Sequence, residues 1–159
     1  MKELKIEIKM QFHQIEELAV EEQILVKAAI KATDNSYAKY SHFHVGAALL
    51  LEDGSIVTGA NQENAAYPSG LCAERSAIFA AQSQHPEFSI KTIAIAARND
   101  DGFTRRPISP CGACRQVMME MEDRYKSDVR VLLYGVEGVY AIRSIKDLLP
   151  VSFVDDCMR

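Results

Sequence analysis

The sequence predicts one α/β domain in which the strands run in mixed directions. Segments with strand-like apolar patterns alternate along the chain with segments of helical periodicity, and this order is typical of the α/β class. The dipeptide Asp53-Gly54 lies between two apolar runs, which indicates a β-hairpin and therefore an antiparallel pair. A length of 159 residues suits a single domain with a substantial core, and no repeat, low-complexity tract or linker divides the chain.

The first third of the chain predicts a strand, a helix and the hairpin. Apolar residues alternate with mostly charged or polar ones in residues 1–14, at Leu4, Ile6, Ile8, Met10 and Phe12. This period of two predicts a half-buried strand. From about residue 16 to residue 38 the apolar residues fall near one helical face, which predicts a helix. The hairpin is predicted over residues 44–61, with the apolar run 45–51 as its first strand.

The rest of the chain predicts further helices and strands in alternation. A loop that contains Pro68 and Gly70 leads into the next helix. The elements predicted after it are a helix over residues 72–84, a buried strand over 91–97, a polar loop over 98–109, a helix over 111–125, strands over 129–134 and 139–142, and about two turns of helix over 144–150.

Three cysteines in two short motifs indicate a metal site. Cys72-Ala73-Glu74 places a carboxylate two residues after a thiol, and Pro110-Cys111-Gly112-Ala113-Cys114 supplies a Cys-x-x-Cys pair. Three thiolates are one ligand short of a closed tetrahedral zinc site, and a catalytic zinc ion uses that open position for water. Glu74 is then next to a ligand and available to move protons. This layout resembles that of zinc-dependent nucleobase deaminases, which combine a His or Cys ligand, a glutamate two residues on, and Pro-Cys-x-x-Cys.

Both motifs lie at predicted helix starts, which bears on the charge of the site. Three thiolates and one zinc ion sum to a charge of −1, and this charge hinders the ionisation of bound water. The N–H groups and partial positive charge of helix N-termini offset it. Arg75 follows Glu74 directly, and we expect its guanidinium to tune the site further. A surface salt bridge is the alternative for Arg75.

Composition and charge exclude several classes of function. The formal net charge of −4 argues against a polynucleotide partner, because affinity for phosphate backbones comes mostly from Lys and Arg. No segment approaches membrane-spanning length, and residues 1–14 lack the pattern of a secretory signal. We therefore expect a cytoplasmic protein with neither nucleic acid nor a membrane as partner. In a cytoplasmic protein, four cysteines indicate metal binding or catalysis rather than disulfide bonds. Cys157 is predicted to be a free thiol.

Five sequence blocks carry a resemblance to a known family, between about residues 24 and 153. The blocks are Ser36–Ala48 (SYAKYSHFHVGAA), Gly59–Tyr67 (GANQENAAY), Cys72–Arg75 (CAER), Pro110–Gln116 (PCGACRQ) and Leu148–Pro150 (LLP). In this order they resemble the cytidine deaminases of the short, homotetrameric class with three cysteine ligands.

The resemblance implies a fold, a reaction and an assembly. The fold is expected to be a three-layer α/β/α sandwich around a mixed five-stranded sheet, with residues 1–14 as an added N-terminal strand and residues 15–159 as the catalytic domain. The implied reaction is the zinc-dependent hydrolytic deamination of cytidine and deoxycytidine to uridine and deoxyuridine, with ammonia as the other product, in pyrimidine salvage. The implied assembly is a homotetramer with one zinc ion per subunit, acting on a small nucleoside.

The resemblance also implies roles for single residues. It makes Cys72, Cys111 and Cys114 the zinc ligands, and Glu74 the proton shuttle. The substrate contacts that it implies are Phe43 against the pyrimidine, Asn61 and Glu63 on the ribose 3′-hydroxyl, Ala73, and Tyr67 near a subunit boundary. Phe153 matches a C-terminal aromatic residue that reaches toward an adjacent subunit. The ribose roles suit the chemistry, since an amide both donates and accepts while a carboxylate accepts from a hydroxyl.

The chain departs from the family pattern at three places. Residues 1–14 lie outside the pattern of shorter members, and we expect them to cover a sheet edge or to extend a subunit contact. Lys39 stands where proline is frequent. His42 and His44 replace the commoner Asn and Lys, and on a strand they would share a face, either as a metal pair or as part of a solvated surface.

Other interpretations stay open. The three cysteines also suit a structural zinc site whose fourth ligand is Cys157 or one of the histidines His13, His42, His44 and His85. Asn61 and Glu63 alternatively cap their own turn, and Phe43 alternatively belongs to the core. Competing functions are deamination of another amino-heterocycle such as blasticidin, deamination of a tRNA base, and a non-catalytic zinc module. The ribose motif of Asn61 and Glu63 counts against another amino-heterocycle. The cysteine in place of a histidine as first ligand counts against a tRNA base. Glu74 counts against a non-catalytic zinc module, which would have no use for it.

Overall fold

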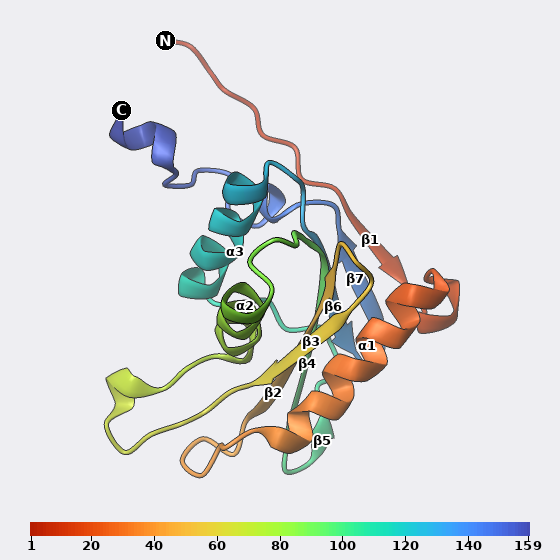
Figure 1. The fold of residues 1–159 in the computed structure, drawn as a ribbon. Helices are drawn as coiled ribbons and strands as arrows, with labels where there is room; N and C mark the ends of the chain where they lie inside the picture. The colour runs from red at the N-terminus through yellow and green to blue at the C-terminus, as the bar shows by residue number, and fades with distance from the viewer.

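The computed structural model describes residues 1–159 and shows a three-layer α/β/α sandwich (Figure 1). The expected fold class is confirmed. The central sheet has the strand order β1-β7-β6-β4-β2-β3, and β5 pairs with β4 beside this path. Only β4 and β6 run parallel to each other, and all other pairs are antiparallel. The strands are β1 (Met10–His13), β2 (His44–Leu51), β3 (Ile56–Ala60), β4 (Ile90–Asn99), β5 (Gly102–Phe103), β6 (Arg130–Gly135) and β7 (Gly138–Ile142).

One long helix covers one face of the sheet, and two helices lie side by side on the other (Figure 1). The first is α1 (Val20–Ala32), and the two on the opposite face are α2 (Ala73–Gln84) and α3 (Gly112–Tyr125). Alternating residues of the strands supply the two cores. Leu25 and Val26 of α1 pack into the smaller core, whereas Ile78 of α2 and Met118 of α3 pack into the larger one.

The sheet has seven strands, where five and an N-terminal strand were expected. The seventh is the two-residue β5, which forms because the chain after β4 turns back at Gly102 with φ +122°. The predicted strand over residues 1–14 is wrong for residues 1–9. β1 pairs with β7 only from Met10, opposite Ile142, where β7 ends. A strand needs a hydrogen-bonded neighbour, and within one chain residues 1–9 have none.

Two predicted helices are shorter than expected. In place of the helix predicted over residues 16–38, the chain forms a 3₁₀ turn (Ile15–Glu17), α1 and a second 3₁₀ turn (Thr33–Asn35). The backbone is extended at Leu18 (ψ 157°), so the first turn and α1 are separate. Residues 144–150 contain only a 3₁₀ turn at Ile145–Asp147. Two further 3₁₀ turns are Tyr67–Ser69 and Asp155–Met158.

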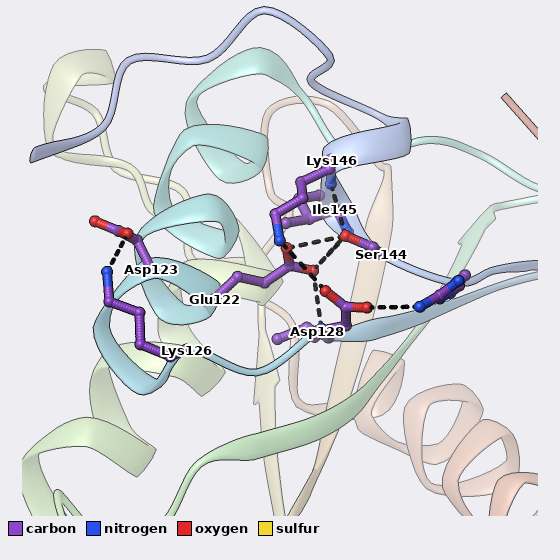
Figure 2. A network of polar contacts seen from close by, with 9 residues as sticks. Glu122, Asp123, Lys126, Asp128, Ser144, Ile145 and Lys146 are labelled. Carbon is purple, nitrogen blue, oxygen red and sulfur yellow. Dashed lines mark hydrogen bonds and ion pairs between the residues drawn. The ribbon is translucent and has the colours of Figure 1, made fainter. Parts of the chain in front are cut away.

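A buried carboxylate fixes the C-terminal half of α3 to the sheet (Figure 2). The Glu122 side chain is 0% exposed. Its oxygens accept hydrogen bonds from the backbone N–H groups of Val129 and Ile145, both at 2.8 Å, and from the Ser144 hydroxyl at 2.9 Å. The Lys146 ammonium lies 3.6 Å away. This network joins α3 to the start of β6 and the end of β7.

Candidate active site

The N-termini of α2 and α3 bring the three cysteines together. Cys72 is the N-cap residue of α2 and Cys111 is the N-cap residue of α3, and both have extended backbone. Cys114 lies in the first turn of α3 and is fully buried. Close packing of α2 on β3 fixes the position of α2. The two elements are so close at Gly59 of β3 that an added Cβ atom would lie 2.4 Å from the Ala77 nitrogen.

The three thiols have the spacing that a zinc ion requires. The Sγ atoms of Cys72, Cys111 and Cys114 all lie within 4.8 Å of one another, and those of Cys72 and Cys111 are 3.9 Å apart. Tetrahedral zinc with Zn–S bonds of about 2.3 Å separates its sulfur ligands by about 3.8 Å. No fourth Cys, His, Asp or Glu belongs to this group. The cluster therefore lacks the fourth ligand of a closed structural site, and Cys157 is exposed elsewhere.

The three thiols lie in different electrostatic surroundings. The Cys114 thiol donates to the Cys72 sulfur, the Arg75 guanidinium donates to it at 3.4 Å, and together they lower the pKa of Cys72 to about 5. The Cys72 thiolate and burial raise the pKa of Cys114. A bound zinc ion deprotonates its thiol ligands outright. Arg75 thus contacts a predicted ligand directly.

Glu74 is a buried acid beside the thiols. It lies in the first turn of α2 and is only 4% exposed. Burial raises the pKa of its carboxyl group, and the negative charge of Cys72 raises it further. A glutamate whose pKa is raised toward neutrality can both accept and release protons, which is the property of a general acid–base group.

A cavity of about 310 Å³ opens in front of Glu74. This volume is in the range of small-molecule sites. Its lining combines apolar walls with a few polar groups: Ser41, Phe43, Val45, Asn61, Cys72, Ala73, Glu74, Ile108, Ser109 and Cys111. The structure therefore brings six of the predicted site residues to one cavity.

The side chain of Asn61 shapes the cavity wall. Its Oδ1 accepts from the Val45 N–H at 2.8 Å, and its Nδ2 donates to the Phe43 carbonyl at 2.9 Å. These bonds tie the end of β3 to the start of β2 and hold Phe43 at the cavity. One amide hydrogen and one oxygen lone pair of Asn61 are left for a ligand.

Glu63 and Tyr67 do not line this cavity. They border a second cavity of about 260 Å³, together with Tyr40, Asn64 and Gly70. The Glu63 carboxylate accepts from the Tyr40 N–H at 2.7 Å and from the N–H and hydroxyl of Ser41. The Ser41 hydroxyl is the main cause of the lowered pKa of Glu63. The two cavities thus meet at Ser41, which lines the first and is bound by Glu63.

Sequence reasoning missed two polar residues of the cavity, Ser41 and Ser109, and also Arg115, which positions Ser109. Arg115 donates to the Pro110 carbonyl, the Leu148 carbonyl and the Ser109 hydroxyl, each at 2.8 Å, and so fixes the loop before Cys111. The signal was present, since Ser41 lies two residues before Phe43 and Ser109 lies two residues before Cys111. Sequence alone does not say which hydroxyls face a cavity.

The expected shared face of His42 and His44 is wrong. His42 precedes β2 in a left-handed turn with φ +55° and lies 3.3 Å from Asp100. His44 begins β2, and its Nδ1 is 2.6 Å from the Ser36 hydroxyl. The two rings therefore form no metal pair. Phe153 is 59% exposed and takes no part in the cavity of its own chain.

A cluster of three thiols with an open cavity and a buried carboxylate beside it marks a catalytic zinc centre, so the protein is a zinc-dependent hydrolase. A family model described as the cytidine and deoxycytidylate deaminase zinc-binding region matches residues 20–127. The chain belongs to this family.

Individual cytidine deaminases are similar to this chain over most of its length. Cytidine deaminase from Halalkalibacterium halodurans is 43% identical over 140 residues, which cover 88% of this chain and 99% of that protein. Cytidine deaminase from Mycobacterium tuberculosis is 39% identical over 132 residues, 82% of this chain and 89% of that protein. The crystal structure of cytidine deaminase from Burkholderia pseudomallei superposes with a TM-score of 0.70 at 41% identity, covering 82% of this chain and 97% of that one. No helix here has the length and apolar character needed to cross a membrane.

Proposed function

We propose that the protein hydrolyses cytidine and deoxycytidine to uridine and deoxyuridine, with release of ammonia, in pyrimidine salvage. The observation that carries the proposal is that Cys72, Cys111 and the buried Glu74 line the 310 Å³ cavity, with the Cys114 sulfur within 4.8 Å of the other two sulfurs. Cytidine deaminases that match nearly their whole length to this chain identify the amino group of cytidine as the group removed.

The three thiols of Cys72, Cys111 and Cys114 would hold one zinc ion per subunit. A bound zinc ion supplies Lewis acidity and lowers the pKa of water to about 7. Three thiolates leave the site with excess negative charge, which opposes that effect. This charge is offset by the N-termini of α2 and α3 and by the guanidinium of Arg75. Arg75 contacts the Cys72 sulfur directly.

Glu74 would move the protons of the reaction. Its carboxylate accepts a proton from water and delivers it to ring nitrogen 3, which makes carbon 4 electrophilic. The hydroxide left from that water forms a bond to carbon 4, and its remaining proton reaches the amino group through Glu74. The carbon–nitrogen bond then breaks, which releases ammonia and leaves the C4 carbonyl of uridine. The buried position and raised pKa of Glu74 suit a group that accepts and releases protons in turn.

The cavity walls would position the nucleoside. The Phe43 ring packs against the pyrimidine, and Ala73 lies beside it at the start of α2. Asn61 uses its free amide hydrogen and lone pair on the ribose 3′-hydroxyl. Glu63 is ionised, because hydrogen bonds lower its pKa, and its remaining lone pairs accept from a ribose hydroxyl at the boundary that Ser41 forms.

The assembly would be a homotetramer in the cytoplasm. Tyr67 is 76% exposed at the rim of the second cavity and Phe153 is exposed near the C-terminus, which suits contacts with neighbouring subunits. The four cysteines are all free thiols, as is usual in a reducing compartment. Residues 15–159 would form the catalytic domain, and residues 1–14 an extension of it.

The decisive experiment is the change in ultraviolet absorbance when substrate is added to purified, zinc-loaded protein. Cytidine and deoxycytidine are compared with CMP, free cytosine and blasticidin. We expect conversion of the two nucleosides alone. No conversion of either nucleoside by protein that retains one zinc ion per subunit would refute the proposed activity.

The role of Glu74 is tested with a matched pair of variants. Glu74→Gln should retain zinc and lose more than about 10⁴-fold in kcat, since one carboxylate serves several proton transfers. Glu120→Gln makes the same chemical change at an exposed position of α3 and should turn over normally. Near-normal turnover by zinc-loaded Glu74→Gln would contradict the assignment.

A further inference from the structure

The N-terminal segment, residues 1–13, carries an apolar face that the chain leaves largely exposed, and only Phe12 at its end packs on another ring, that of Tyr140. Its apolar residues are each between 47% and 84% exposed: Leu4, Ile6, Ile8, Met10 and Phe12. All five have the same parity, so an extended backbone directs them to one side. Figure 1 shows the segment leaving β1, passing the end of β7 and projecting away from the sandwich at the N-terminus. Before that point, Glu7 and Lys9 border a hollow with Asp128 and Arg143.

The segment continues into an open sheet edge. β1 is the terminal strand of the sheet, and only its inner edge is paired, with β7. The outer backbone edge of Met10–His13 faces no strand. An open edge followed by an alternating apolar segment is a template for pairing with another strand, and folded proteins rarely leave one uncovered.

The opposite face of the segment alternates in charge. Glu3, Lys5, Glu7 and Lys9 occupy successive positions of the other parity. The Lys5 ammonium lies 2.9 Å from the Glu7 carboxylate, so these side chains share a face. A segment with this alternation is complementary to itself when two copies run in opposite directions.

We propose that residues 3–9 pair as an antiparallel strand with the same residues of a second copy of this chain, centred on Ile6. In this register Glu3 of one copy faces Lys9 of the other, and Lys5 faces Glu7. The two-fold symmetry repeats each pair, which gives four Glu–Lys pairs. Cross-strand pairs of opposite charge stabilise an antiparallel ladder. Residues 1–2 of each copy then lie along the outer edge of the partner's β1, opposite Met10 and Gln11.

The apolar face fits the same register. Leu4 lies opposite Ile8, and Ile6 lies opposite its own copy on the two-fold axis. Six apolar side chains, three from each copy, thus form one continuous row. Cross-strand contacts between such side chains remove part of their surface from water.

Other registers are less favourable. A parallel, in-register arrangement places each charge opposite its own copy. Centring the antiparallel pair on Lys5 or on Glu7 also brings like charges together. Centring it on Leu4 or on Ile8 keeps only two Glu–Lys pairs, half of those in the register centred on Ile6. A parallel arrangement shifted by two residues gives three Glu–Lys pairs, one fewer than the antiparallel register centred on Ile6. Charge therefore favours the register centred on Ile6, and its self-complementarity favours a second copy as the partner.

Disulfide trapping tests the register in zinc-loaded protein that carries Cys157→Ser, which removes the exposed free thiol. Ile6→Cys should cross-link two copies on mild oxidation, because position 6 faces itself. Leu4→Cys is the matched control. Its two copies lie four residues apart along the pair, about 13 Å, and this exceeds the reach of a disulfide. The Leu4→Cys/Ile8→Cys double variant should cross-link.

Charge exchange tests the cause. In the Ile6→Cys protein, Lys5→Glu/Lys9→Glu and Glu3→Lys/Glu7→Lys each leave one sign on the face, and each should slow cross-linking by about tenfold or more. An equimolar mixture of the two should recover it and give the mixed dimer, which mass spectrometry identifies. The variant with all four charges exchanged should cross-link at the original rate.

Two results would overturn the proposal. Equal cross-linking of Ile6→Cys and Leu4→Cys would show that the segments meet without a register. Undiminished cross-linking of either single-sign variant would show that charge does not direct the pairing. Unchanged cytidine turnover by all variants verifies that the catalytic domain is intact, because these residues lie outside the cavity.

Discussion

Replacing Glu122 with glutamine should destabilise the fold without touching the cavity. The side chain keeps its size, so the change leaves no space behind. If the amide oxygen takes the place of Oε1, it still accepts from the N–H groups of Val129 and Ile145. The amide nitrogen then occupies the Oε2 position and faces Lys146, whose ammonium lies 3.6 Å from that oxygen (Figure 2).

The size of the effect follows from the loss of charge. A hydrogen bond to a charged group contributes about 1.5–3 kcal/mol and a neutral one about 0.5–1.5 kcal/mol. Two buried backbone donors therefore each lose about 1 kcal/mol. Lys146 is 60% exposed, so the loss of its attraction adds less than about 1 kcal/mol. The sum is about 2–3 kcal/mol, a large part of the stability of a typical domain.

Urea unfolding measures this loss as a lower urea concentration at the midpoint, with an unchanged dependence of the free energy of unfolding on urea concentration. Protein and zinc concentrations must be held constant, because binding to the folded state alone adds stability. Glu120→Gln, at an exposed position of the same helix, is the control and should change the free energy of unfolding by less than about 0.5 kcal/mol. If Glu122→Gln cost no more than this control, the network would not hold α3 to the sheet.

Three further outcomes are expected. Cys114→Ser should lose both zinc and turnover, and a zinc-loaded, active variant in metal analysis would remove Cys114 from the ligand set. Asn61→Ala should raise KM for cytidine. It should also lower the free energy of unfolding by about 1–2 kcal/mol, because two hydrogen bonds to half-buried backbone are lost. A raised KM with no change in the urea midpoint would contradict the role of Asn61 in the cavity wall. Gly59→Ala places a Cβ atom 2.4 Å from the Ala77 nitrogen and should cost about 1–3 kcal/mol by overpacking, and an unchanged Tm would show that α2 moves away freely.

Local sequence patterns predicted most elements because strand and helix periodicities are set by near neighbours. The hairpin, the two helices that carry the cysteines, and the strands β4, β6 and β7 are confirmed. The pattern in residues 1–14 has the same period, yet only Met10–His13 pair as a strand. Periodicity shows which side chains would share a face, and it does not show whether a neighbouring strand is present.

For the site, the motifs predicted the metal cluster because ligand type and spacing are chemical requirements. Cys72 and Cys111 stand at the helix N-termini, as expected. The contacts of Glu63 with Tyr40 and Ser41, and of Arg115 with the Leu148 carbonyl, were not predictable. These bonds join residues that are distant in sequence, and their geometry depends on how the loops pack.

The sequence by itself determined the class of fold, the zinc motifs with their adjacent acid, and the family. Each depends on the identity and spacing of residues within short segments. Only the tertiary structure decided which residues share the cavity. It placed Asn61 and Ser41 in the wall, Glu63 and Tyr67 at a neighbouring hollow, and His42 away from His44. The physical reason is that a cavity is formed by side chains from several elements, and their meeting is fixed by the packing of two helices on a twisted sheet rather than by any local pattern.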